Sequence, residues 1–107
     1  MQSLERATLN ELRFREVNKD IDARRAELGI EERIPYLCEC EDVACREFVR
    51  LSPAEYRTAR VDERHFLLVQ GHPFRSGTIV AQRDGHMVVL KDGEAAEVIE
   101  KEEGGDG

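Results

Sequence analysis

All three cysteines of this 107-residue chain lie within eight consecutive positions. They are Cys38, Cys40 and Cys45, a spacing at which three thiolates can converge on one point in a tight loop. Thiolate ligands favour a soft divalent ion, and zinc is the usual one. An odd number of cysteines, two of them separated by a single residue, fits a reducing compartment better than a disulfide scaffold. The cluster therefore predicts a metal centre, and the fold must bring a fourth ligand to it.

Three histidines are candidates for that fourth ligand of a tetrahedral zinc site. His72 ranks first because it stands between Gly71 and Pro73, directly after an expected strand, where a sharp and stiff turn would fix the imidazole. His65, which precedes an apolar strand, ranks second, and His86, which follows an Asp-Gly turn, ranks third. The predicted ligands of Zn²⁺ are Cys38, Cys40, Cys45 and His72.

Other interpretations of the cysteines stay open. Two thiols at this spacing form a strained and easily reduced disulfide, so a redox-responsive thiol or zinc switch is the main alternative. Iron is the alternative metal, since thiolates also bind iron–sulfur clusters. Free cysteines can also be small core residues, but Glu39, Glu41 and Asp42 make this loop look too polar for a core segment. These acids raise thiol pKa values and disfavour a reactive thiolate, whereas a bound metal overrides their charge.

Motifs of common enzyme classes are missing from the sequence. A Cys/His nucleophile would need an activated thiol and an oxyanion site, yet every cysteine is in the cluster and no glycine-rich loop accompanies it. Phosphate-loop, H-E-x-x-H and G-x-S-x-G patterns do not occur. We therefore expect a non-catalytic zinc-binding interaction or regulatory module, not an enzyme. A small Cys/His enzyme is the least favoured alternative.

Composition and charge narrow the class of protein further. Charged residues make up 36% and hydrophobic residues 40%, which is typical of a folded domain. The net charge is −7, and residues 92–107 supply most of it with seven acids and one lysine. An acidic chain without a basic stripe is a poor nucleic-acid binder, and no apolar run approaches membrane-spanning length. We expect a cytoplasmic protein with neither nucleic acid nor membrane as a partner.

Hydrophobic periodicity and turn residues predict an α+β fold, with a long N-terminal helix packed on a small, mostly antiparallel sheet. Helices are expected at residues 3–28, 53–60 and 94–100. Strands are expected at residues 34–37, 48–51, 66–69, 78–82 and 86–90. The first two strands would form a hairpin that carries the cysteines at its tip, a zinc knuckle. The domain would comprise residues 1–100, with the N-terminal helix in 1–29, the knuckle core in 34–100 and a disordered acidic tail at 101–107.

The N-terminal helix is longer than a domain of this size requires. It would span about 38 Å, more than twice the roughly 13 Å radius of gyration expected for this chain length. Ala7, Phe14, Ile21 and Leu28 recur every seven residues and form an apolar stripe. This stripe either covers the sheet or meets another surface. The expected partners are therefore an unknown protein or, through this helix, a second copy of the chain.

The cysteine spacing resembles the post-SET zinc motif of protein lysine methyltransferases, where three cysteines join a fourth ligand from elsewhere in the chain. The similarity covers the eight residues from Cys38 to Cys45. It implies ligation by three thiolates. It implies no methyltransferase activity, because the chain is too short for that domain and shows none of its other motifs.

Over most of its length the chain also resembles a family of small bacterial proteins whose activity is not established. The shared pattern has an asparagine in the first helix, a Cys-Glu-Cys knuckle with a third cysteine, a Glu-Tyr pair on a capped helix and a Gly-His pair. Here these are Asn18, Tyr36 to Cys40, Cys45, Glu55-Tyr56 and Gly71-His72. Segments 88–91 and 94–97 also fit, whereas Tyr36 and Gln70 replace a phenylalanine and a proline. The resemblance implies ligation by three cysteines and one histidine.

Overall fold

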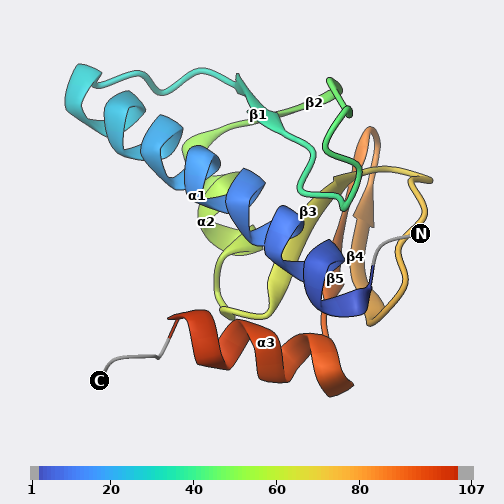
Figure 1. Cartoon of the computed structure of the whole chain (residues 1–107). Helices are drawn as coiled ribbons and strands as arrows, with labels where there is room; N and C mark the ends of the chain where they lie inside the picture. Colours follow the sequence, from blue (N-terminus) through green and yellow to red (C-terminus); the bar gives the residue numbers. More distant parts are fainter. Residues whose placement is uncertain (1–2, 104–107) are drawn as a thin grey trace.

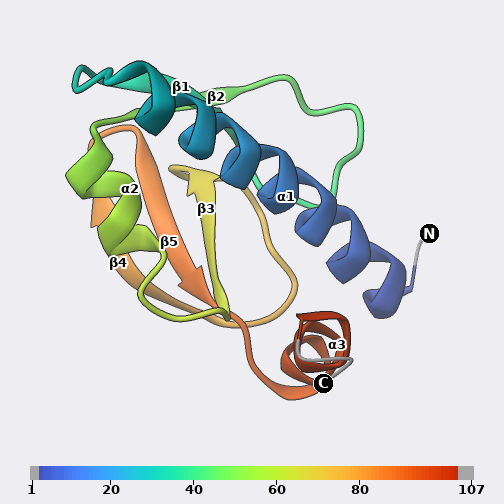
Figure 2. The same cartoon turned by 90° about the vertical axis from the view of Figure 1, so that its left-hand side faces the viewer.

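A computed structural model describes residues 3–103, which form an α+β fold of three helices and five strands (Figure 1). The helices are α1 (Leu4–Leu28), α2 (Pro53–Ala59) and α3 (Gly93–Glu103). The strands are β1 (Ile34–Leu37), β2 (Phe48–Leu51), β3 (His65–Val69), β4 (Thr78–Arg83) and β5 (His86–Leu90). α1 packs against β1 and α3, while α2 packs against β2 and β3 (Figure 2). Within residues 3–103, none of the helices is long and apolar enough to cross a membrane.

The strands form two antiparallel sheets that meet at the cysteine segment. β1 pairs with β2, so residues 38–47 lie at the tip of the predicted hairpin. The second sheet has the order β3-β5-β4. The free edge of β3 is covered by the chain that follows β1, because the backbone N–H of Glu39 donates to the carbonyl of Leu67 at 2.7 Å. The metal-ligand loop is therefore held against the edge of the larger sheet.

Two clusters of buried side chains meet at β3. The first includes Leu12, Cys38, Cys40, Phe66, Leu68, Met87, Val89 and Ile99. The second includes Tyr36, Val49, Leu51, Tyr56 and Leu67. Within it the rings of Tyr36 and Tyr56 stack with centroids 4.4 Å apart. Successive residues of a strand point to opposite faces, so the apolar run of β3 supplies both clusters and links the hairpin to the rest of the core.

α1 begins and ends where the sequence predicts, but the residues on its buried face differ from the predicted apolar stripe. Ser3 caps the helix by accepting a hydrogen bond from the backbone N–H of Arg6 at 3.1 Å, and Gly29 ends it with a φ of +68°. Leu28 is 62% exposed, so the seven-residue stripe does not cover the sheet along its whole length. The buried positions are largely polar: Ala7, Thr8, Asn10, Glu11, Leu12, Arg15, Asn18 and Arg25.

α3 is longer than the sequence predicts. Its expected end is Glu100, but the helix continues to Glu103. The carboxylate of Glu103 lies 3.4 Å from Arg15 and 3.2 Å from Lys19, so two ion pairs with α1 favour the added residues. Residues 101–103 therefore belong to the helix, and the tail boundary predicted after Glu100 is wrong. The rest of the predicted tail, residues 104–107, lies outside the described residues.

Candidate metal centre

The structure brings the four predicted ligands together. One side-chain ligand atom from each of Cys38, Cys40, Cys45 and His72 lies within 4.8 Å of the others. The Sγ of Cys38 is 3.2 Å from the Nδ1 of His72. Ligands of a tetrahedral zinc ion stand up to roughly 3.8 Å from one another, given metal–ligand bonds of about 2.0–2.3 Å. The group is thus close to the size needed to hold a metal ion.

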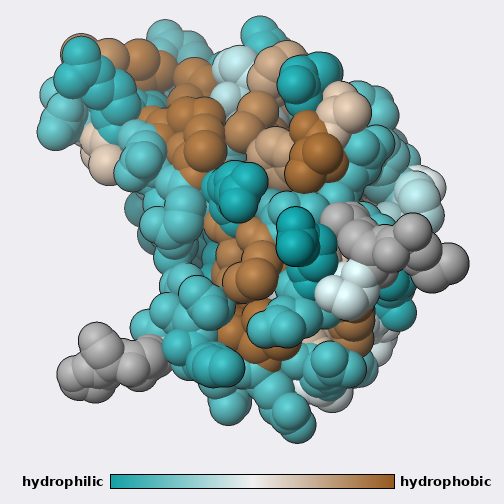
Figure 3. Space-filling model, viewed as in Figure 1, coloured by the Kyte–Doolittle hydropathy of each residue, from teal (hydrophilic) through white to brown (hydrophobic). Residues whose placement is uncertain are grey.

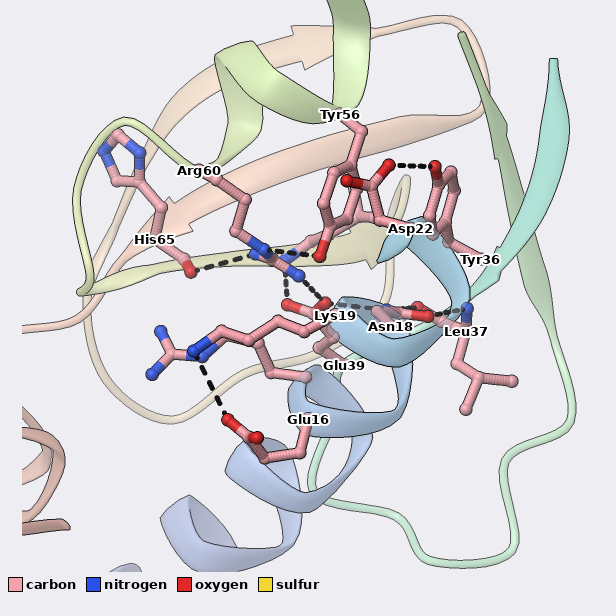
Figure 4. Close-up of polar contacts among 12 residues, drawn as sticks. Glu16, Asn18, Lys19, Asp22, Tyr36, Leu37, Glu39, Tyr56, Arg60 and His65 are labelled. Carbon is pink, nitrogen blue, oxygen red and sulfur yellow. Dashed lines mark hydrogen bonds and ion pairs between the residues drawn. The ribbon is translucent and has the colours of Figure 1, made fainter. Parts of the chain in front are cut away.

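Glu39, between the first two cysteines, anchors this loop in the core. It is fully buried. One carboxylate oxygen accepts from the backbone N–H of Leu67 at 2.9 Å. The other accepts from the Nδ2 of Asn18 at 2.7 Å and from the guanidinium of Arg60 (Figure 4). The expectation that the acids make this loop too polar for burial is therefore wrong at Glu39, because a cation and two amide donors satisfy its carboxylate.

Asn18 and Arg60 fix the base of the knuckle from two different helical regions. The amide of Asn18 donates to the carbonyl of Leu37 at 2.9 Å and accepts from its N–H at 2.7 Å, so it acts as a short strand partner for the end of β1. Arg60 also donates to the hydroxyl of Tyr56 at 3.0 Å and to the carbonyl of His65 at 3.4 Å (Figure 4). These bonds hold the chain on either side of Cys38, at Leu37 and Glu39.

His72 is held from two sides. Its backbone N–H donates to the carbonyl of Val69 at 3.0 Å, and its Nε2 lies 2.8 Å from a carboxylate oxygen of Glu47. Its Nδ1 faces the thiol of Cys38. A carboxylate on the far nitrogen is the usual arrangement for a metal-binding histidine, because it fixes the ring and raises its basicity. No sequence pattern points to Glu47, since it is one of many glutamates in an acidic chain.

The two lower-ranked histidines lie elsewhere. His65 begins β3 opposite Leu90, and His86 begins β5 opposite Val69. His86 instead lines a cleft beside α2 with Glu55 and Arg83, and burial lowers its pKa. The structure therefore brings His72 to the thiols and places His65 and His86 in other parts of the sheet.

The thiols influence one another's ionisation. A hydrogen bond from Cys38 lowers the pKa of Cys40 to about 5. The same hydrogen bond, together with burial, raises the pKa of Cys38, and burial raises the pKa of Cys45. One thiolate forms readily, while the other two need a compensating positive charge before they ionise. A divalent cation provides that charge, because a coordinated thiol is deprotonated.

Comparisons with known proteins give no match: no protein-family model fits the chain, no curated protein is similar to it, and no solved structure is similar to it.

Proposed function

We propose that the chain is a zinc-binding interaction or regulatory module in which a structural Zn²⁺ is bound by Cys38, Cys40, Cys45 and His72. The observation that carries this proposal is the convergence of their ligand atoms within 4.8 Å. Four protein ligands complete the tetrahedron of a structural zinc site and leave no open position for water or substrate. The metal would therefore hold the knuckle in shape without taking part in a reaction.

The donor set favours zinc over other metals. Magnesium and calcium bind oxygen ligands, whereas three thiolates and an imidazole suit zinc. Iron–sulfur clusters are most often held by four cysteines. A set of three cysteines with one histidine is more typical of structural zinc.

The zinc would hold an exposed apolar surface in place. Val43, in the loop between Cys40 and Cys45, is 58% exposed, and Phe48, at the start of β2, is also 58% exposed. These two exposed apolar side chains are available for contact with another protein. Coordination would fix the loop that presents them, which links metal binding to recognition of a protein partner.

Elemental analysis tests the metal assignment. Protein purified without chelators should contain about one zinc per chain. A content below about 0.2 equivalents, with three freely titrating thiols, would contradict a structural metal. The identity of the fourth ligand is tested by metal retention in His72→Ala, with His65→Ala and His86→Ala as matched controls. We expect loss of zinc only in His72→Ala, and equal retention in all three variants would reject His72.

A redox-responsive zinc switch is the second candidate, and the partial exposure of Cys45 favours it. Cys45 is partly exposed, and Cys40 lines a cleft of about 280 Å³ together with His72 and Phe74. Peroxide could take two electrons from a pair of thiolates there, forming a disulfide and water and releasing the metal. Release of zinc by peroxide, reversed by a thiol reductant, would favour the switch. Thiols that stay unreactive until a chelator is added would favour a purely structural site.

A further inference from the structure

A second polar site lies between α1 and the chain that joins α2 to β3. It is a cleft of about 340 Å³. Arg15 and Lys19 line it from α1, and Tyr56 and Arg60 line it from the region of α2. Figure 4 shows Lys19 and Arg60 reaching into this region from different elements. The cleft gathers three cationic side chains, and the acidic residues Asp22, Asp62 and Glu63 also line it.

Arg15 is the unusual member of this group. It is 1% exposed, its Nη1 donates to the carbonyl of Glu63, and its guanidinium stacks 4.6 Å from the ring centroid of Phe66. Its Nε and Nη2 are buried without a hydrogen-bond partner among residues 3–103. Buried donors are nearly always bonded, because an unbonded one keeps the full cost of losing water. These two nitrogens form one edge of the guanidinium, which matches a pair of oxygens on a phosphate or carboxylate.

An internal carboxylate already approaches this edge. One oxygen of Glu103, at the end of α3, lies 3.4 Å from the Nη2 of Arg15 and 3.2 Å from the Nζ of Lys19. The distance to Arg15 is longer than a good hydrogen bond. The position of Glu103 thus shows that this edge attracts an anionic oxygen. Its carboxylate still leaves the Nε and Nη2 of Arg15 without a hydrogen bond.

We propose that this cleft binds the phosphate group of a small molecule between Arg15 and Lys19, with Glu103 as a displaceable internal competitor. A phosphate has more charge and more oxygens than a carboxylate, so it can bond the edge of Arg15 and the ammonium of Lys19 together. The cleft has room for about ten waters, more space than a phosphate ion needs. The carboxylate of Asp22, also in the lining, can accept hydrogen bonds from hydroxyl groups on the rest of the ligand.

Calorimetric titration of the full chain as purified, whatever its zinc content, tests this site. The probes are inorganic phosphate, glycerol phosphate and the dicarboxylate malonate, each at the same ionic strength in chloride. Saturable binding of glycerol phosphate, tighter than that of malonate, is expected. Lys19→Ala should weaken it by about tenfold, the effect of losing one charge-assisted hydrogen bond. Lys101→Ala, which removes an exposed lysine of α3, is the matched control and should have no effect.

Glu103→Gln provides the second variant, since it removes the carboxylate that pairs with both cations. Glu16 lies 3.3 Å from the Nζ of Lys19 and stays in place. Glu103→Gln should tighten phosphate binding several-fold, whereas Glu102→Gln, a change at an exposed neighbour on α3, should not. Inorganic phosphate binding as tightly as the ester would support the site and identify free phosphate as the source. The proposal is overturned if neither the native chain nor Glu103→Gln binds phosphate, if Lys19→Ala binds it unchanged, or if malonate binds more tightly. The result is independent of zinc content, so the two proposals can fail separately.

Discussion

The side chain that joins the candidate metal centre to the core is an acid. Glu39 lies between two buried thiols, and its carboxylate contacts Arg60, Asn18 and the N–H of Leu67. A buried charge of this kind is stable only while it is paired and hydrogen-bonded. The residue therefore anchors the loop that carries Cys38 and Cys40.

Replacement of Glu39 tests this role. Glu39→Ala should lower the free energy of unfolding by about 3–5 kcal/mol, because it leaves the guanidinium of Arg60 buried without its carboxylate. Glu41→Gln is the matched control, since Glu41 also adjoins a cysteine but pairs with Arg75 near the surface, where an ion pair contributes much less. Urea unfolding of the zinc-loaded variants gives the comparison. Similar losses in both variants would show that Glu39 has no special part in the core.

Glu47 should act on the metal through His72. Its carboxylate lies 2.8 Å from the Nε2 of that histidine and is 57% exposed. Glu47→Gln should weaken zinc binding by about tenfold, at the lower end of the range for such supporting carboxylates because solvent screens the contact. Competition with a chromophoric chelator measures the affinity. Glu32→Gln, in the exposed loop before β1, is the control, and an equal effect there would exclude a specific role.

For individual residues, the sequence predicted which candidate ligands would come together, but it did not predict which side chains support those ligands. The cysteine spacing and the Gly71-His72-Pro73 turn are local signals, so the convergence of the four candidate ligands could be predicted. The roles of Glu39 and Arg15 depend on contacts with residues 21 and 48 positions away. In a sequence with 36% charged residues, nothing marks one acid or one arginine as buried.

Helices and strands whose ends carry clear capping or turn residues lie where the sequence predicts them. Ser52 and Glu55 make the reciprocal hydrogen bonds of a capping box at the start of α2. The Asp84-Gly85 turn joins β4 to β5 and pairs Arg83 with His86, and the register shifts farther along, between Ile79 and Ala81. The buried face of α1 was not predictable in the same way. Glu11 on that face pairs with Lys91 at 3.0 Å, both side chains nearly fully buried, and a heptad pattern carries no information about such a distant partner.

The apolar stripe of α1 is partly exposed. We therefore expect this helix to mediate self-association. Val17 and Leu28 line an open apolar cleft of about 390 Å³ with Ile21, Ile30 and Ile34. In Figure 3 hydrophobic surface gathers over the C-terminal half of α1 at the upper left. We expect a homodimer through this face, and Val17→Glu with Leu28→Glu should shift it to monomer in sedimentation experiments. Both side chains are exposed, so the fold should survive the changes.

Val61→Glu is the control for that experiment, because Val61 is 75% exposed on a different part of the surface. A native chain that sediments as a monomer at all concentrations would contradict the homodimer. The exposed face would then remain available to an unrelated protein. A dimer that persists in the double variant would place the interface elsewhere on the molecule.

Across the whole molecule, a metal bound at the candidate centre would add a further link between the β1–β2 hairpin and the larger sheet. The thiols come from the β1–β2 hairpin, whereas His72 follows β3 of the larger sheet. Zinc bound by all four side chains would close the chain between Cys45 and His72. Cross-links between distant positions restrict the unfolded chain and so stabilise the fold. The Glu39 network and the two core clusters hold the same sheets together without metal, so their contribution and that of zinc can be separated.

Removal of zinc should therefore loosen the ligand loops and leave the rest folded. After chelation, hydrogen exchange should accelerate at the amides of Cys45 and His72, which donate to the carbonyls of Asp42 and Val69. The amide of Leu67, bonded to the buried carboxylate of Glu39, should stay protected. The His72→Ala variant is the control, because a chelator should change its exchange little once zinc binding is lost. Equal acceleration across α1 and β5 would show that the metal supports the entire fold, and unchanged exchange at every site would show that metal stabilises none of it.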